Sequence, residues 1–141
     1  MFIEHIRLSQ QARDQLIKLK RITGLKNWNV LCRWAFCTSL AEETPPANVK
    51  VPADSNVEMT WTVFGGEYAE LYAELVRERA RIDGFGDDDE SLAQLFRLHL
   101  HRGISYLAGD KRLTSIADLV ERATVAAEIP SGFFLTNPVE E

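Results

Sequence analysis

The chain has 141 residues and a mass of 16.0 kDa, 45% of its residues are hydrophobic, and its formal net charge is −5. These values suit one domain with a hydrophobic core, and the lack of a long apolar run excludes a transmembrane helix. Charged residues interrupt the opening MFIEHIRLSQ, unlike a signal peptide, so we expect a cytoplasmic protein with no membrane partner. Cys32 and Cys37 are the only cysteines, and in a reducing compartment we expect buried thiols in preference to a disulfide.

The net charge hides an asymmetry along the chain. Residues 1–40 contain seven basic and two acidic residues, a net charge of +5, whereas residues 41–141 contain nine basic and nineteen acidic residues, a net charge of −10. A basic end on an acidic body predicts a directional electrostatic surface. The alternative is that the two halves neutralise each other, within one chain or between subunits.

A short strand and a helix are predicted first. The alternation in FIEHIRLS is typical of a strand, with one face made of Phe2, Ile6 and Leu8 and the other of Ile3, His5 and Arg7. Ser9 is a good N-cap for a helix over residues 10–23, because its hydroxyl can accept a hydrogen bond from the first turn. Gly24 follows where a residue in the left-handed conformation ends a helix.

A second helix is predicted from Asn27 or Asn29 to about Ala41. It is apolar on nearly every side, so it must be buried on several sides. In a small domain, another subunit supplies such burial most easily. We therefore expect a homo-oligomer.

The remainder of the chain is predicted to be mostly helical. We expect a loop at 42–56, a strand at 57–63 ending at Gly65 and Gly66, and helices at 67–82, 91–107 and 115–124. We therefore predict a single domain at 1–123 that is mainly α with short β-strands. It consists of a strand–helix–helix unit at 1–41 and a strand and helices at 57–123. Residues 124–141 are either a mobile tail or an arm that places Phe133, Phe134 and Leu135 on a neighbour.

The strand–helix–helix order of residues 1–41 resembles a ribbon-helix-helix unit. In that arrangement, strands of two subunits pair antiparallel and the ribbon can enter the major groove of DNA. His5 and Arg7 would then face bases or phosphates. The alternative is that the strand pairs inside the molecule and these side chains are only solvated.

The turn between the two predicted helices is the best candidate for a binding site. Four cations surround Gly24, namely Lys18, Lys20, Arg21 and Lys26. A helix N-terminus adds free N–H groups and a partial positive charge, and glycine lets an anion approach closely. The pattern predicts a grip on the DNA phosphate backbone without a catalytic group. An ordinary solvated surface is the alternative.

Patterns typical of catalysis are scarce. His99 and His101 are two residues apart and point to different sides of a helix, and the cysteines lack the spacing of a metal site. The acidic run at 87–90 is better suited to capping a helix than to holding a cation, because it lacks the pattern of an EF-hand loop. No phosphate-binding or nucleophile motif occurs. We expect no enzyme, no cofactor and no bound metal.

The segment Ile6 to Pro46 closely resembles the start of the DndE family of DNA sulfur modification proteins. The run NWNVLCRWAFC is the distinctive part, and WTVFGGEY and FRLHLHRGISYL extend the resemblance through about Leu119. This resemblance implies a part in replacing a non-bridging phosphate oxygen of DNA with sulfur. The sulfur chemistry is assigned to partner proteins, including a cysteine desulfurase and an iron–sulfur enzyme.

For this chain the resemblance implies a small DNA-binding accessory, a homo-tetramer that prefers nicked duplex DNA. Its lysine-rich contact surface carries over to Lys18, Lys20, Arg21, Gly24 and Lys26, the same stretch that the residues indicate. Two rivals stay open. The chain could be a scaffold for the other modification proteins without touching DNA, or an enzyme that makes the nick.

Overall fold

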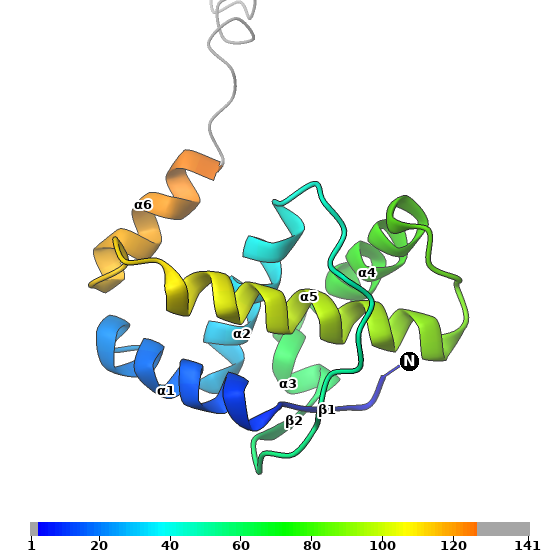
Figure 1. The fold of residues 1–141 in the computed structure, drawn as a ribbon, viewed down its shortest axis with the longest axis horizontal. Coiled ribbons are helices and arrows are strands. Elements are labelled where there is room, and N and C mark those ends of the chain that lie inside the picture. Colours follow the sequence, from blue (N-terminus) through cyan, green and yellow to red (C-terminus); the bar gives the residue numbers. More distant parts are fainter. Residues whose placement is uncertain (1–2, 127–141) are drawn as a thin grey trace, which may run out of the picture.

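The computed structural model describes residues 3–126, so the predictions for Phe2 and for residues 127–141 lie outside the described part of the chain. The fold is mainly helical and contains a two-stranded antiparallel sheet (Figure 1). Its elements are β1 (His5–Arg7), α1 (Gln10–Thr23), α2 (Trp28–Leu40), β2 (Glu58–Thr60), α3 (Trp61–Gly65), the 3-10 turn η1 (Gly66–Tyr68), α4 (Ala69–Asp83), α5 (Asp89–Gly109) and α6 (Ile116–Ala126). The last helix extends past the predicted domain end at residue 123.

Helix α5 forms the centre of the molecule, and α1, α2 and α4 pack around it (Figure 1). Its core side chains include Phe96, whose ring lies 5.1 Å from that of Phe36 on α2, measured between centroids. The closest approach of the two helices is at Gly103, where a Cβ would lie 1.7 Å from the carbonyl oxygen of Ala35. Only glycine fits at this crossing. Burial of α2 is therefore supplied largely by α5 of the same chain.

The predicted strand pairs inside the molecule. Strand β1 pairs antiparallel with β2, with Ile6 opposite Met59. Ile6 and Leu8 are buried, and His5 and Arg7 face outward, as the alternation predicted. Ile3, which the alternation placed with His5 and Arg7, is buried instead. The predicted pairing of this strand with a second subunit along the edge that faces β2 is wrong, because β2 of the same chain occupies that edge. The intramolecular alternative is confirmed.

Helix α1 has the predicted bounds and caps. The Ser9 hydroxyl accepts a hydrogen bond from the backbone N–H of Ala12, and Gly24 has a φ of 76° and donates its N–H to the Lys20 carbonyl. These contacts satisfy backbone groups that every helix leaves open at its ends. Likewise, Asp88 caps α5 by accepting from the N–H of Ser91, so the acidic run caps a helix as predicted.

The strand predicted over residues 57–63 is too long. Thr60 ends β2 and caps α3 by accepting from the N–H of Val63, so the chain turns helical at Trp61. The helix predicted from residue 67 begins two residues later, after η1. Two apolar residues of this segment, Tyr68 of η1 and Leu71 of α4, are exposed. The alternation of apolar residues gave no sign that Thr60 caps α3, and this cap decides where the strand ends.

Both cysteines are free, as predicted, but only Cys32 is buried. Burial raises the pKa of the Cys32 thiol to about 12, so this side chain acts as a small apolar residue of the core. Cys37 is exposed, because it lies on the side of α2 that faces away from the α5 crossing. The prediction of two buried thiols is wrong for this residue.

The C-terminal end of α2 is closed by two arginines from other helices. Arg79 of α4 donates to the carbonyls of Leu40 and Glu42 at 2.7 and 2.6 Å and pairs with Asp83 at 2.9 Å. Arg102 of α5 donates to the Ser39 carbonyl at 3.0 Å. Carbonyls at a helix end need such donors. These contacts tie α2, α4 and α5 together, and we call this region the closed end of α2.

Candidate nucleic-acid interface

The α1–α2 turn has a fixed backbone. Gly24 reverses the chain in the left-handed conformation, and the Thr23 hydroxyl accepts from the N–H of Leu25 at 3.2 Å. A Cβ added at Gly24 would have no heavy atom within 4 Å apart from those of Gly24 and its two chain neighbours, so the space beside this residue is open. A larger residue would be strained here by its positive φ and not by crowding. The turn therefore holds the ends of two helices in a defined position with room for a ligand.

The N-terminal end of α2 lacks a side-chain cap. Asn27 has the extended backbone of an N-cap residue, with φ −94° and ψ 126°, but its side chain makes no capping hydrogen bond. The first backbone bond here runs from the N–H of Leu31 to the Asn27 carbonyl. The N–H groups of the first turn are therefore available, and the helix dipole makes this end favourable for an anion. We call it the open end of α2.

The four predicted cations lie close to this end in the sequence, but they are engaged to different degrees. Lys18 donates to the carbonyl of Ala108 in the last turn of α5 at 2.8 Å. The Lys20 ammonium lies over the Trp28 ring, 3.5 Å from its centroid. Arg21 and Lys26 are exposed, and no ion pair or hydrogen bond of their side chains is found within residues 3–126. Arg21 and Lys26 are thus the freest cations of the turn.

His5 and Arg7 do not belong to this group. They lie on β1, before α1, and a helix of this length separates them from the turn by about 20 Å, at about 1.5 Å per residue. Arg7 donates to Glu58 at 3.2 Å and to the Ser55 carbonyl at 3.0 Å, and His5 lies 3.9 Å from the same glutamate. The positive charge of Arg7 is therefore offset locally by Glu58 of β2.

Two basic residues near the turn were not singled out from the sequence. The bond from Lys18 to Ala108 places the last turn of α5 beside α1, and the following loop carries Lys111 and Arg112, both exposed (Figure 1). Arg112 pairs with Asp110 at 3.4 Å. In the sequence, Lys111 and Arg112 are only a basic pair in a polar turn, which does not indicate that they lie beside α1. Arg33, by contrast, donates inward to the Phe64 carbonyl at 2.6 Å, so its partner lies within the chain.

A second polar constellation lies at the closed end of α2. His99 contacts Asp83 through Nε2 at 2.9 Å and Ser39 through Nδ1 at 2.8 Å. Because a carboxylate only accepts, Nε2 carries the proton, and Nδ1 accepts from the Ser39 hydroxyl. The order resembles a catalytic triad, but Ser39 and His99 are fully buried, and Arg102 donates to the Ser39 oxygen. Burial lowers the pKa of His99. The contacts join three helices and leave no route for a substrate to the hydroxyl.

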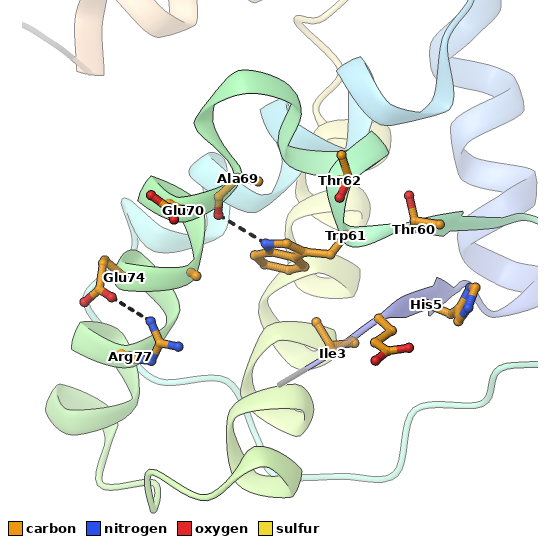
Figure 2. Close-up of a pocket in the computed structure, with 11 residues that line it drawn as sticks. Ile3, His5, Thr60, Trp61, Thr62, Ala69, Glu70, Glu74 and Arg77 are labelled. Atoms are coloured by element: carbon orange, nitrogen blue, oxygen red, sulfur yellow. Dashed lines mark hydrogen bonds and ion pairs between the residues drawn. The ribbon is translucent and has the colours of Figure 1, made fainter. Parts of the chain in front are cut away.

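A groove of about 740 Å³ lies between the end of the β-ribbon and α4 (Figure 2). Trp61 lies in it and donates from its indole nitrogen to the Ala69 carbonyl at 3.1 Å. Glu70 and Glu74 line the α4 side, and Arg77 donates to Glu74 at 2.6 Å. Within residues 3–126, no cluster of three or more His, Cys, Asp or Glu side chains has the arrangement to hold a metal ion. This groove is remote from the α1–α2 turn, which contributes none of its lining residues.

None of the helices in the described part of the chain combines the length and the hydropathy that a bilayer crossing requires. At the turn, Arg21, Lys26 and Asn27 are exposed. Thr23 is buried and Leu25 packs against the hydrophobic core. The charge exposed at the turn is therefore cationic. The arrangement suits the binding of an anion at the open end of α2.

Comparison with known proteins gives a consistent result. The family model described as DNA sulphur modification protein DndE matches residues 5–115. The crystal structure of DndE from Escherichia coli B7A, involved in DNA phosphorothioation modification, is 25% identical in sequence, with a TM-score of 0.65 over 76% of this chain and 98% of that chain. A DndE mutant with glycines replaced by lysine is also 25% identical, with a TM-score of 0.56 over 74% of this chain and 97% of that chain. No curated protein matches.

Proposed function

The chain belongs to the DndE family and is a component of the DNA phosphorothioation system, and we propose that it binds the phosphate backbone of duplex DNA without catalysis. The open end of α2 carries this proposal. There, uncapped N–H groups and the helix dipole lie at a turn fixed by Gly24, and the exposed cations Arg21 and Lys26 flank this turn in the sequence. Phosphate is the anion that DNA offers at regular spacing along its surface.

The contacts of the other predicted residues rank them within this proposal. Lys20 is held next to the open end by Trp28 and belongs to the phosphate grip. Lys18 contributes less, because its ammonium already serves the Ala108 carbonyl. His5 and Arg7 form at most a separate, weaker contact, because Glu58 offsets the charge of Arg7 and lies beside His5. Lys111 is exposed in the loop after α5 and is a further candidate for this surface, whereas Arg112 is paired with Asp110.

A preference for nicked duplex fits a protein that assembles as a homo-tetramer. Several copies of the open end would then have to contact one DNA molecule, which bends the duplex. A nick lowers the free energy of bending, because one strand is interrupted. Phosphate contacts carry no sequence information, so no base preference follows from this site. Equal affinity for matched intact and nicked duplexes would contradict this part of the proposal.

The deciding experiment replaces the three cations of the open end together, Lys20→Ala, Arg21→Ala and Lys26→Ala. We expect a large loss of affinity for duplex DNA at low salt. Each phosphate contact contributes about −0.9 to the slope of log affinity against log salt, so the slope should become less steep by up to about 2.7. Fluorescence anisotropy over a range of salt concentrations measures both quantities, with the oligomer mass determined alongside.

Lys50→Ala with Arg81→Ala is the matched control, because both side chains are exposed and lie on other surfaces. The control should keep the wild-type affinity and slope. If the triple variant also keeps them, the open end does not bind DNA.

The alternative function is a scaffold that assembles the sulfur modification proteins without touching DNA. Exposed apolar side chains on η1 and α4 favour it, since Tyr68, Leu71 and Ile82 are 58%, 55% and 61% exposed. Such residues often mark protein contacts. The triple variant separates the two functions, because a scaffold would keep its protein partners and show no salt-dependent DNA binding to lose.

A further inference from the structure

Trp28 lies at the open end of α2 but has no role in the phosphate contacts proposed above. It is the first residue of α2, half-buried, and it packs against the hydrophobic core. Its ring also lies under the ammonium of Lys20, which comes from the last turn of α1. A lysine over a tryptophan face is attracted by the negative charge density of the ring. The ring therefore links the two helices across the turn through a charged group.

This contact fixes where a flexible cation is found. A lysine ammonium on the surface normally samples many positions, because its four-carbon stem rotates freely. At 3.5 Å from the ring centroid, the Lys20 ammonium is held beside the first turn of α2, where the N–H groups are uncapped. A ligand that needs both the ammonium and the N–H groups then finds them already in position. Such preorganisation lowers the entropy cost of binding.

We infer that Trp28 is a positioning residue for DNA binding, which holds the Lys20 ammonium beside the open end of α2. The inference rests on the proposed function. Trp28 itself need not touch DNA, because its effect passes through Lys20. Its loss should therefore weaken binding without removing a phosphate contact, which distinguishes it from the loss of Lys20.

The test compares Trp28→Leu, Trp28→Phe and Trp34→Leu in the full chain. Trp34 is the matched control, since it lies on the same helix, is half-buried and packs against the same core. For a partly exposed cation–π contact we expect Trp28→Leu to weaken duplex binding by about two- to five-fold, with an unchanged salt slope. Trp28→Phe should recover most of the affinity, because it keeps a ring, and Trp34→Leu should bind as the wild type does. Circular dichroism verifies that each variant is folded.

A measurement without DNA tests the contact itself. A ring under the Lys20 ammonium shifts the NMR signals of the neighbouring Lys20 methylene protons upfield, and this shift should vanish in Trp28→Leu and persist in Trp34→Leu. An unshifted wild-type signal overturns the inference, as does wild-type affinity in Trp28→Leu or an equal loss in Trp34→Leu. When the wild type binds DNA and Trp28→Leu binds it equally well, only this inference fails. When the triple cation variant keeps full affinity, the proposed function itself fails.

Discussion

The two ends of α2 differ in how their backbone groups are satisfied. At the closed end, Arg79 and Arg102 arrive from α4 and α5 and donate to its last carbonyls. At the open end, Asn27 makes no capping bond, and the nearby Arg21 and Lys26 have no partner within residues 3–126. Cations lie near both ends. At the closed end they donate to the carbonyls of α2, whereas near the open end Arg21 and Lys26 are left without a partner in the described residues. The comparison teaches that a cation count alone does not locate a binding surface. What matters is which cations the fold leaves without an acceptor.

Of the changes considered, removing Arg79 from the closed end should cause the largest loss of folding free energy. In Arg79→Met, the carboxylate of Asp83 loses one of its two buried partners, the other being His99. The carbonyls of Leu40 and Glu42 lose a donor. Breaking a buried ion pair on one side costs about 3–5 kcal/mol of folding free energy. Urea unfolding measures the loss. Arg81→Met on the same helix serves as the control, because Arg81 is exposed and pairs with Glu78 at the surface. A change within about 0.5 kcal/mol is expected there. Similar losses in the two variants would contradict the closed end as described.

Acid should have the next largest effect, through His99 at the closed end and through His101, which accepts a hydrogen bond from the Ser9 N–H. Burial lowers the folded-state pKa of His99 and of His101 below the ordinary value of 6.5. Arg79 and Arg102 also disfavour a positive charge on His99, whereas Asp83 favours it. Because the unfolded chain binds these protons more readily, their contribution to stability is complete above pH 6.5 and is lost as the pH falls towards the lowered pKa values.

The free energy of unfolding should therefore fall between about pH 7 and about pH 5, as measured by urea unfolding at several pH values. His5→Asn, on the surface of β1, is the control and should keep this pH profile. A stability that stays level or rises as the pH falls would show that the buried histidines do not bind fewer protons in the folded state.

Giving the open end a charged cap should have the smallest effect on stability and the most informative one. In Asn27→Asp, a negative charge at the helix N-terminus should stabilise the fold by about 0.3–1 kcal/mol. The same carboxylate would repel phosphate, so we expect weaker DNA binding from a more stable protein. Asn27→Ser adds a capping hydroxyl without charge, which would occupy one N–H group of the first turn. It should therefore weaken DNA binding, but less than Asn27→Asp does. Thermal unfolding and anisotropy check the two effects, and stronger DNA binding by Asn27→Asp would contradict an anion site at this end.

The sequence was most informative where the determinants are local. Ser9 and Gly24 lie next to the residues whose backbone they satisfy, so α1 could be predicted with its caps, and the basic turn could be found from charge. The sequence was less informative where a local signal competed with another. Thr60 continues an alternating strand pattern and also suits an N-cap, and the cap decides the structure.

Contacts between distant residues could not be predicted at all. Arg79 reaches residues 36 to 39 positions earlier in the chain, and β1 pairs with a strand more than fifty residues later. For the same reason, His5 and Arg7 looked like members of the candidate site although Glu58 offsets them. The hydrogen bond from Lys18 to the Ala108 carbonyl and the contact of Lys20 with the Trp28 ring also could not be predicted from the spacing of these residues.

The crossing at Gly103 also bears on how the protein can change over evolution. Main-chain atoms of α2 and α5 meet there, so the polypeptide backbone and not side-chain volume sets the spacing of the two helices. A larger core residue nearby cannot be accommodated by moving the helices apart without opening a void at the crossing. A smaller one cannot be compensated by bringing them together. Variation in this part of the core is therefore restricted to exchanges that conserve volume, whereas the exposed turn at the other side of α2 is free to accumulate or lose charge.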